Sequence, residues 1–212
     1  MIRKYQKNDR AAVRRISCNT AFLGQPATIF LDADRLLADV LTRYFTDYES
    51  ESSLVAIKDK QVVGYINGAK NVTVMNKILR SRIIPYIIRE CIRSCACLKP
   101  KNLRFLGYFI ISFLKGEFYI PDFSRDYPAT FHINIDAGYR GFRIGKMLID
   151  HYLDLLRGKK LPGVYCTTVS DQARRFFAKQ GFRILFRKRR SYWDNYTGER
   201  LVFSVMGKIL PS

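Results

Sequence analysis

Residues 129–146 read ATFHINIDAGYRGFRIGK, and this stretch decides the fold. Phe131, Ile133 and Ile135 alternate with His132, Asn134 and Asp136, which predicts a strand with one apolar face. Three glycines among basic residues follow, and an apolar pattern of helical period then begins. We therefore expect a strand, a basic turn over residues 138–145, and a helix over residues 144–156. The expected helical stripe is Met147, Leu148, His151, Tyr152 and Leu155.

The turn has the features of an anion-binding site. A strand that leads through glycines into a helix leaves free backbone N–H groups at the helix N-terminus, where the helix dipole also favours negative charge. Arg140, Arg143 and Lys146 add positive charge. The spacing matches neither the P-loop nor the dinucleotide-binding glycine pattern. A left-handed turn with solvated arginines is the alternative, and this stretch alone leaves both open.

The flanking sequence supplies the rest of a sheet. Downstream, GVYCTTV predicts a strand, Ser170 an N-cap for the helix DQARRFFAKQ, and Gly181 its C-cap. FRILF and LVFSVMGKIL predict two closing strands. Upstream we expect a strand over residues 2–6, a helix to about residue 20, a helix that starts at Asp32 or Asp34, and a hairpin over residues 52–71 with its turn at 58–60.

Residues 76–117 differ in character, and we interpret them as a helical insertion within one domain that spans residues 1–212. Pro85 suits the first turn of a helix to about residue 98, with an apolar stripe opposite basic residues. That stripe consists of Ile87, Ile88, Cys91, Ile92 and Cys95, and the basic side of Arg82, Arg89 and Arg93. Asn102 is expected to cap a second helix that Gly116 terminates. This helix is apolar almost all round, so we expect it to be buried or covered.

Two motifs in order give the chain a family resemblance. Arg140-Gly141-Phe142-Arg143-Ile144-Gly145 and the later run from Ser170 to Phe182, SDQARRFFAKQGF, resemble the GNAT superfamily of acyl-CoA-dependent N-acetyltransferases. The order of strands and helices also fits, and the resemblance covers most of the chain except the insertion. It implies an α/β fold of the α+β kind, with a mixed, mostly antiparallel sheet flanked by helices. It also implies acetyl-CoA, or another acyl-CoA, as co-substrate and a primary amine of a small molecule or peptide as acceptor.

The resemblance also implies roles for individual residues. Backbone N–H groups from Phe142 to Lys146 would bind the CoA pyrophosphate, and main-chain groups of Ile133 and Ile135 would bind the pantetheine arm. The sheet would splay between this strand and the one at Val164. A backbone N–H in the gap would stabilise the oxyanion while the amine attacks directly, with no covalent enzyme intermediate. The cofactor-binding residues implied are Ile133, Ile135, Arg140, Gly141, Phe142, Arg143, Ile144, Gly145, Lys146, Ser170 and Phe177.

Three positions depart from the family pattern. Arg143 stands at a glycine position, where it would either crowd the phosphate or contact it. Ser170 replaces an asparagine that touches the cofactor, and it can still donate a hydrogen bond. Phe177 replaces the tyrosine that commonly protonates the leaving thiolate, so Tyr165, Cys166 or water would serve instead. A GNAT fold that binds CoA without catalysis is therefore an alternative.

His132 is the candidate general base because its intrinsic pKa suits the role. It must face the cleft for that purpose, and alternation does not show which face does; a hydrogen-bonded histidine packed in a strand is the alternative. Asp136 is a candidate cap of the turn, and His151 is expected to be structural. Cys91, Cys95 and Cys97 lack a complete ligand set, so we expect buried helical thiols and no metal site.

Charge suggests further partners without choosing among them. The 212 residues carry 37 Lys and Arg against 18 Asp and Glu, a net charge of +19, which attracts nucleic acid, anionic membranes or a phosphorylated cofactor. The run RILFRKRRSYW could bind nucleic acid, but a solvated strand end is favoured. The insertion combines basic and apolar faces, as peripheral membrane segments do. No signal peptide or transmembrane segment is predicted, the expected location is the cytoplasm, and a homodimer is left open.

Overall fold

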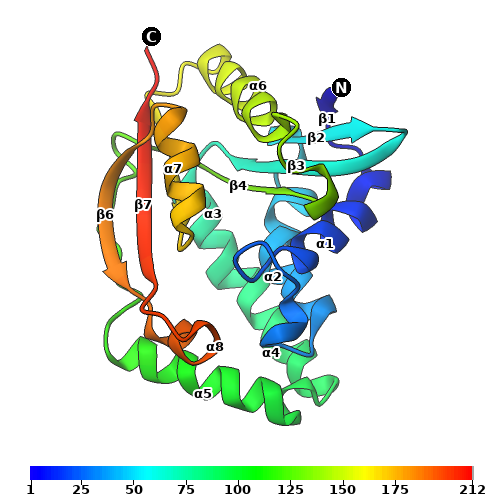
Figure 1. Ribbon diagram of the computed structural model, residues 1–212, viewed down its shortest axis with the longest axis vertical. Helices are drawn as coiled ribbons and strands as arrows, with labels where there is room; N and C mark the ends of the chain where they lie inside the picture. The colour runs from blue at the N-terminus through cyan, green and yellow to red at the C-terminus, as the bar shows by residue number, and fades with distance from the viewer. Residues whose placement is uncertain (212) are drawn as a thin grey trace.

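The computed structural model describes residues 1–211, which form one seven-stranded sheet in the order β1-β2-β3-β4-β5-β7-β6 (Figure 1). Neighbouring strands are antiparallel except β4 and β5, which are parallel. The strands are β1 (Ile2–Lys4), β2 (Ser53–Lys58), β3 (Gln61–Ala69), β4 (Ala129–Ile135), β5 (Gly163–Thr168), β6 (Arg183–Arg189) and β7 (Val202–Ile209). The mixed, mostly antiparallel sheet predicted from the sequence is confirmed.

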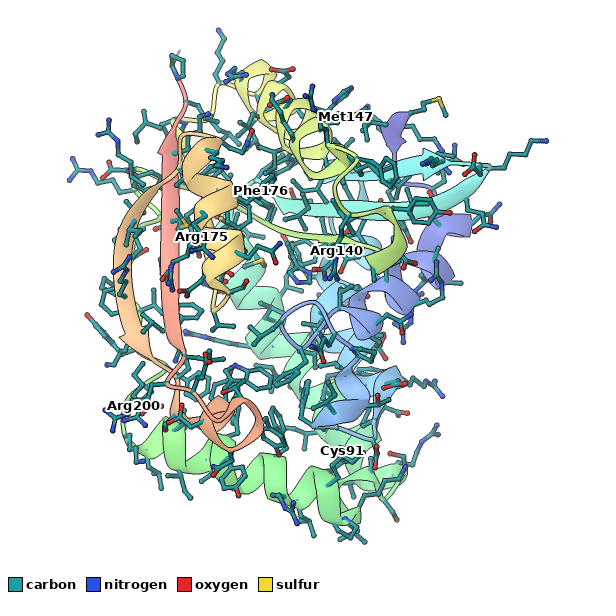
Figure 2. All side chains as sticks on the ribbon, viewed as in Figure 1. Cys91, Arg140, Met147, Arg175, Phe176 and Arg200 are labelled. Atoms are coloured by element: carbon teal, nitrogen blue, oxygen red, sulfur yellow. The ribbon has the colours of Figure 1, made fainter. Side chains whose placement is uncertain are left out.

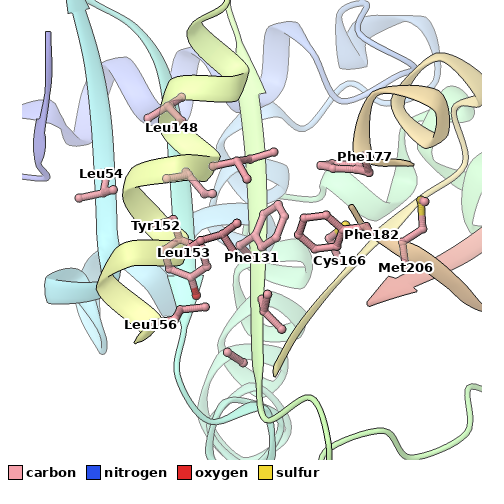
Figure 3. Packing of buried hydrophobic residues seen from close by; sticks show 14 of the residues in the cluster. Leu54, Phe131, Leu148, Tyr152, Leu153, Leu156, Cys166, Phe177, Phe182 and Met206 are labelled. Atoms are coloured by element: carbon pink, nitrogen blue, oxygen red, sulfur yellow. The ribbon is translucent and has the colours of Figure 1, made fainter. Parts of the chain in front are cut away.

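Helices cover both faces of the sheet. The helices are α1 (Arg10–Asn19), α2 (Asp34–Asp47), α3 (Val72–Ile78), α4 (Ile84–Arg93), α5 (Pro100–Leu114), α6 (Ile144–Gly158), α7 (Asp171–Lys179) and α8 (Asp194–Thr197). Helix α6 packs on one face of the sheet, where Leu148 and Tyr152 meet Phe131 (Figure 3). Helix α1 packs on the opposite face, where Val13 and Ile16 meet side chains of β2 and β3. Because side chains alternate between the two faces of each strand, the sheet has one hydrophobic core on each face.

The face of β4 that carries Phe131, Ile133 and Ile135 packs with α6 and α7, as the apolar alternation predicts. The set of α6 residues that face the core differs from the predicted apolar stripe by a shift of one residue. Its inward residues include Leu148, Tyr152 and the residues that follow each of them, whereas Met147 and His151 lie on the solvent side. Glycine at position 145 explains the shift, because the missing side chain lets this edge of the helix approach β4 and α7.

Helical structure between β3 and β4 begins at Val72, earlier than the predicted residue 76. The Asn71 side chain caps α3 by accepting hydrogen bonds from Thr73 N and Val74 N at 3.0 and 3.1 Å. A π-helical turn over Leu79–Ile83 then leads into α4. The side of this segment that includes Ile83 packs against Tyr44 of α2, so the insertion is anchored to the core.

Several expectations for the insertion are wrong. Helix α4 ends at Arg93, and Cys95 adopts a left-handed conformation; Cys91 lies within the helix, whereas Cys95 and Cys97 lie beyond its end, and Cys95 is exposed. Asn102 does not cap α5, which begins at Pro100; its side chain accepts from Asp32 N and donates to Ala96 O, both at 2.7 Å. Gly116 does end α5, with a φ of +67°.

The expected burial of α5 is also wrong. Helix α5 lies across the end of the molecule opposite α6, and only its inner side packs against the rest of the chain (Figure 1). Its outer side chains, among them Ile110 and Leu114, remain exposed. Similarly, Ile88 and Ile92 of the predicted α4 stripe face solvent. Over residues 1–211, no helix combines the length and hydrophobicity needed to cross a bilayer.

Candidate active site

The turn between β4 and α6 presents a run of free backbone donors. Arg143 is the N-cap of α6 and has φ +58° and ψ 8°, so the chain turns sharply into the helix. The first backbone hydrogen bond of the helix runs from Met147 N to Arg143 O at 3.1 Å. Within the part of the chain that the structure describes, none of the five N–H groups from Phe142 to Lys146 has an acceptor. Such a run of unpaired N–H groups at a helix N-terminus is suited to an anion.

Cations around this turn do not all point at it. Arg140 donates from Nη2 to Gly24 O at 2.7 Å, and so ties the turn to the segment that follows α1 (Figure 2). Lys146 pairs with Asp150 at 2.6 Å on the helix surface. Arg143 is exposed and has no hydrogen-bond partner among the described residues. Lys58, which the sequence reasoning missed, lies 3.9 Å from the centre of the Phe142 ring. Arg143 and Lys58 are therefore the cations best placed to join a phosphate.

Gly145 sits where α6 closely approaches its neighbours. A Cβ atom at this position would lie 3.1 Å from Cζ of Phe176 and 3.2 Å from Cδ1 of Ile135. Phe176 belongs to α7, and its ring lies beside the first turn of α6 (Figure 2). Glycine thus permits close packing within the run of free N–H groups. By contrast, Gly141 has φ +89° and no atom within 4 Å of its ideal Cβ position, so it serves the turn conformation.

Replacing Arg143 by glycine tests whether the side chain crowds or grips a phosphate. A left-handed arginine costs about 1 kcal/mol, and the greater freedom of glycine in the unfolded chain offsets much of this. We expect Arg143→Gly to change the free energy of unfolding by less than about 1 kcal/mol in urea titrations. We expect it to weaken acetyl-CoA binding about three-fold, since one exposed charge pair is lost. Arg143→Lys, which keeps the charge, should bind normally; tighter binding by the glycine variant would show crowding.

The sheet opens between β4 and β5 beside this turn. The two strands pair only at Ala129–Val164 and Thr130–Tyr165, whereas β3 follows β4 as far as Ile135. Asp136 N donates to Val63 O at 2.9 Å, so the main-chain groups of residues 136, 134 and 132 point towards β3. Those of Ile133 and Ile135 consequently point into the gap. The splay has the form expected for a pantetheine arm held by these two residues.

His132 lies on the face of β4 opposite Phe131, beside β3 and α1. Its Nδ1 is 3.3 Å from Oη of Tyr65, and Asn134 Nδ2 donates to the same oxygen at 3.0 Å. We assign the proton to Nδ1, because Asn134 Nδ2 lies 3.5 Å from Nε2 and an amide NH2 can only donate, so Nε2 carries the lone pair. The ring then presents Nε2 as its basic nitrogen. Burial lowers the pKa of His132 to about 4, so the imidazole is neutral and able to accept a proton at pH 7.

The depressed pKa of His132 also makes stability depend on pH. The folded pKa of about 4 lies below the unfolded value of 6.5, so the unfolded chain binds the extra proton first as the pH falls. This stability is present above about pH 6.5 and is lost towards pH 4. Between about pH 7.5 and 5 we expect His132 to account for about 2 kcal/mol of lost unfolding free energy. Urea titrations of the native protein and His132→Gln should differ by this amount; parallel pH profiles would contradict it.

Two polar side chains beside His132, those of Tyr65 and Asn67, were not found by sequence reasoning, whereas alternation already placed Asn134 on its face. Tyr65, Asn67 and Asn134 lie on the same face of β3 and β4, with Asn67 paired to His132 in the register. Asn67 is fully buried, and neither atom of its amide has a partner among the described residues. Only the alternation of YIN in β3 could have indicated Tyr65 and Asn67, and it does so only once the strand register is known. Asp136, a candidate cap of the turn, instead pairs through its carboxylate with Arg15 at 2.8 Å.

Tyr165 and His132 share one face of the sheet. Thr130 is the register partner of Tyr165, and paired residues in neighbouring strands point to the same side. Burial raises the pKa of the half-buried Tyr165 hydroxyl, with a smaller contribution from the charge of Asp122. Cys166 faces the opposite side, in the core with Phe182, where burial raises the pKa of its thiol far above the ordinary value. Tyr165 stands where the two strands part, and Cys166 is enclosed.

The α7 residues named by the motif have structural contacts. Phe177 is buried with Phe131 and Phe182, at ring-centre distances of 5.9 and 5.8 Å (Figure 3). It therefore supplies packing and no hydroxyl beside the gap. Ser170 caps α7 by accepting from Ala173 N at 3.3 Å, as predicted, and its O–H remains able to donate. The φ of Gly181 is +82°, in agreement with its predicted place after the helix.

In the basic and aromatic run over residues 183–193, Arg183, Arg187 and Arg189 are exposed, whereas Arg190 and Trp193 are buried. Arg190 is buried, donates to Glu117 O, and lies over the rings of Phe118 and Phe203. Trp193 packs in a T-shaped arrangement against Phe30, with ring centres 4.9 Å apart. These side chains join the insertion to the sheet instead of presenting free stacking surfaces. Over residues 1–211, no group of three or more His, Cys, Asp or Glu could hold a metal ion.

Comparison with known proteins agrees with this geometry. The model of the acetyltransferase (GNAT) family matches residues 25–182. No curated protein matches the sequence. The structure titled SsHAT superposes with a TM-score of 0.70 at 17% identity, covering 100% of this chain and 98% of the other. The putative acetyltransferase yncA from Salmonella typhimurium with acetyl-CoA gives 0.58 at 17% (100% and 94%), and Drosophila melanogaster polyamine N-acetyltransferase gives 0.60 at 13% (99% of each).

Proposed function

The chain belongs to the GNAT acetyltransferase family, and on that premise we propose that it transfers an acetyl group from acetyl-CoA to a primary amine of a small molecule or peptide. The observation that carries the proposal is the run of five unpaired N–H groups from Phe142 to Lys146, which lies beside the gap between β4 and β5. A pyrophosphate would accept these donors, and the gap would admit the arm that bears the thioester. The residues present therefore fit the cofactor.

We assign each polar group at the gap a role. Main-chain N–H groups of Ile133 and Ile135 would orient the arm, and one of them would stabilise the charge that develops on the acyl oxygen. Nε2 of His132 would accept the proton that the attacking amine loses. Tyr165 would supply a proton to the departing sulfur, although its raised pKa makes it a weak donor, and water would share this task. Acetyl-CoA supplies the activated acyl group, so no covalent enzyme intermediate is needed.

The acceptor would enter from the face that carries His132. On this face Asn67 and Asn134 offer side-chain amides, and α1 forms a wall through residues such as Arg15, which pairs with Asp136. We propose that the insertion shapes acceptor choice, because Phe105 of α5 packs on a cluster that includes Phe30, and Val169, the residue after β5, packs on the same cluster. Phe105→Ala should then change the KM for the acceptor and leave the KM for acetyl-CoA unchanged. An unaltered acceptor preference in this variant would remove the role of the insertion.

Two measurements test the proposal in order. Acetyl-CoA at about a hundred times its Kd should raise the melting temperature by about 5–10 °C. A screen of amines, polyamines, amino sugars and peptides should then release free CoA only when both substrates are present. Absence of any thermal shift would refute the proposal. Stabilisation without turnover on any acceptor would favour the alternative of a CoA-binding protein without catalysis, for which the lack of a hydroxyl at Phe177 is the relevant observation.

A further inference from the structure

The outer face of α5 is an exposed apolar surface on a fixed helix. Six large apolar side chains on this face are between 44% and 77% exposed. They are Leu103, Leu106, Ile110, Ile111, Phe113 and Leu114. Arg104 is the one charged residue among them, and Gly107 adds no side chain. A contiguous apolar surface of this kind marks an interaction site more often than a lone exposed leucine does.

Contacts on the inner side of α5 fix its orientation. A small rotation of the helix would break these contacts, so it would not bury the outer face. Phe105 packs on Phe30 and Trp193, and the rings of Phe109 and Phe118 lie 4.5 Å apart. Near the C-terminal end of the helix, the buried Ser112 hydroxyl donates to Glu117. The apolar outer face is therefore presented outward by a packed and hydrogen-bonded inner face.

A second apolar stripe occurs on α4. Ile84, Ile88 and Ile92 recur every fourth residue and are 48%, 55% and 66% exposed. Residues three or four apart share one side of a helix, so these three side chains form a continuous row. Leu98, between α4 and α5, is also 66% exposed. The insertion thus carries most of its exposed aliphatic side chains on its two long helices.

Charges around these stripes are almost all positive. Residues 76–117 contain nine Lys and Arg against two acids, and neither acid is free. The Glu117 carboxylate is buried and accepts hydrogen bonds from Ser112 and from Ser191, while Glu90 pairs with Arg93 at 3.3 Å and is largely covered. The surface of the insertion therefore presents apolar side chains and cations together.

We propose that the outer face of α5 docks on an anionic lipid bilayer. Acyl chains near the headgroups would receive the apolar side chains, while lipid phosphates would pair with the cations. A second copy of the chain fits less well, because it would bring the exposed Arg104 and Lys115 of one copy against those of the other. Docking at this end leaves α6, at the opposite end of the molecule, away from the bilayer (Figure 1). The inference does not depend on the proposed acetyl transfer.

Vesicle sedimentation tests the proposal with the full chain. We expect the protein to bind vesicles of equal parts phosphatidylcholine and phosphatidylglycerol at least about ten-fold more tightly than vesicles of phosphatidylcholine alone. The double variant Ile110→Asp and Leu114→Asp should lose about ten-fold in affinity for the anionic vesicles. Arg104→Glu with Lys115→Glu should do the same. Val40→Asp is the matched control, because Val40 is 49% exposed on α2, and it should bind normally.

Three results of these binding and light-scattering measurements would contradict the proposal. No binding to the anionic vesicles would refute it, as would an equal loss of binding in Val40→Asp. A dimer in light scattering that Ile110→Asp with Leu114→Asp separates would assign the face to a second copy. The far-UV circular dichroism spectrum and the melting temperature show whether each variant is folded. A variant that keeps both signals and loses only vesicle binding supports the proposal.

Discussion

Gly145→Glu should lower the affinity for acetyl-CoA by at least about 100-fold in isothermal titration. Two effects act together at this position. The new Cβ would lie 3.1 Å from Phe176 and 3.2 Å from Ile135, so the first turn of α6 must move relative to α7. The carboxylate also places a negative charge among the five free N–H groups, where it would compete with a phosphate for the same donors.

Two companion variants separate these effects from simple loss of structure. Gly158→Glu puts the same side chain at the other end of α6, where no atom lies within 4 Å of the ideal Cβ position, and it should bind acetyl-CoA normally. Gly145→Ala adds the methyl group without charge, and its smaller loss of affinity measures the steric part alone. If Gly145→Glu is folded by circular dichroism and binds like the native protein, the phosphate site lies elsewhere.

The sequence was sufficient to predict the backbone of this site. The β4 strand and the start of α6 follow from alternation and helical period, which are local properties, whereas the left-handed conformation at Arg143 was only an open alternative. The splay between β4 and β5 was predicted only through the family resemblance, and the short ladder at residues 129–130 and 164–165 confirms it. Local sequence and family together therefore predicted the strand, the gap and the helix start at which we propose that the cofactor binds.

The partner that each side chain contacts depends on residues far away in the sequence, so these contacts could not be predicted from local patterns. Arg140 looked like a phosphate ligand, but its guanidinium donates to Gly24 O, 116 residues earlier in the chain. Lys58 reaches the turn from a hairpin, through the Phe142 ring. The partner of His132 is Tyr65, 67 residues away. Each of these contacts depends on strand register or helix packing, which a single sequence leaves undetermined.

Helix α5 shows the limit of composition as a guide to burial. A helix with apolar residues on all sides predicts a covered position, and the side with Phe105, Phe109 and Ser112 is indeed packed or buried. The opposite side has no element of the chain left to cover it, because α8 and the loop after β6 occupy only the inner side (Figure 1). An apolar composition indicates that burial of a helix would be favourable, but it does not show whether another part of the same chain packs against it.

His132→Gln should lower kcat with the best acceptor by about 100-fold and leave the KM for acetyl-CoA unchanged. Glutamine keeps a polar side chain beside Tyr65 but cannot accept and carry away a proton. We expect a decrease at the lower end of the range for general bases, because an imidazole with a pKa of about 4 has only a small driving force for accepting a proton. The cofactor contacts proposed at residues 142–146 lie on the other side of β4 and should be undisturbed.

The other histidine in the chain provides the matched control. His151 is exposed on α6, so His151→Gln makes the same chemical change away from the gap and should retain full activity. The pH profile adds a readout that a packing role would not change. Because His132 is neutral above about pH 5, the rise of kcat/KM towards alkaline pH should follow the pKa of the acceptor amine and shift when an amine of lower pKa is used. A rise near pH 6.5 that His132→Gln abolishes would instead show an imidazole that titrates in water, which contradicts its burial against Tyr65.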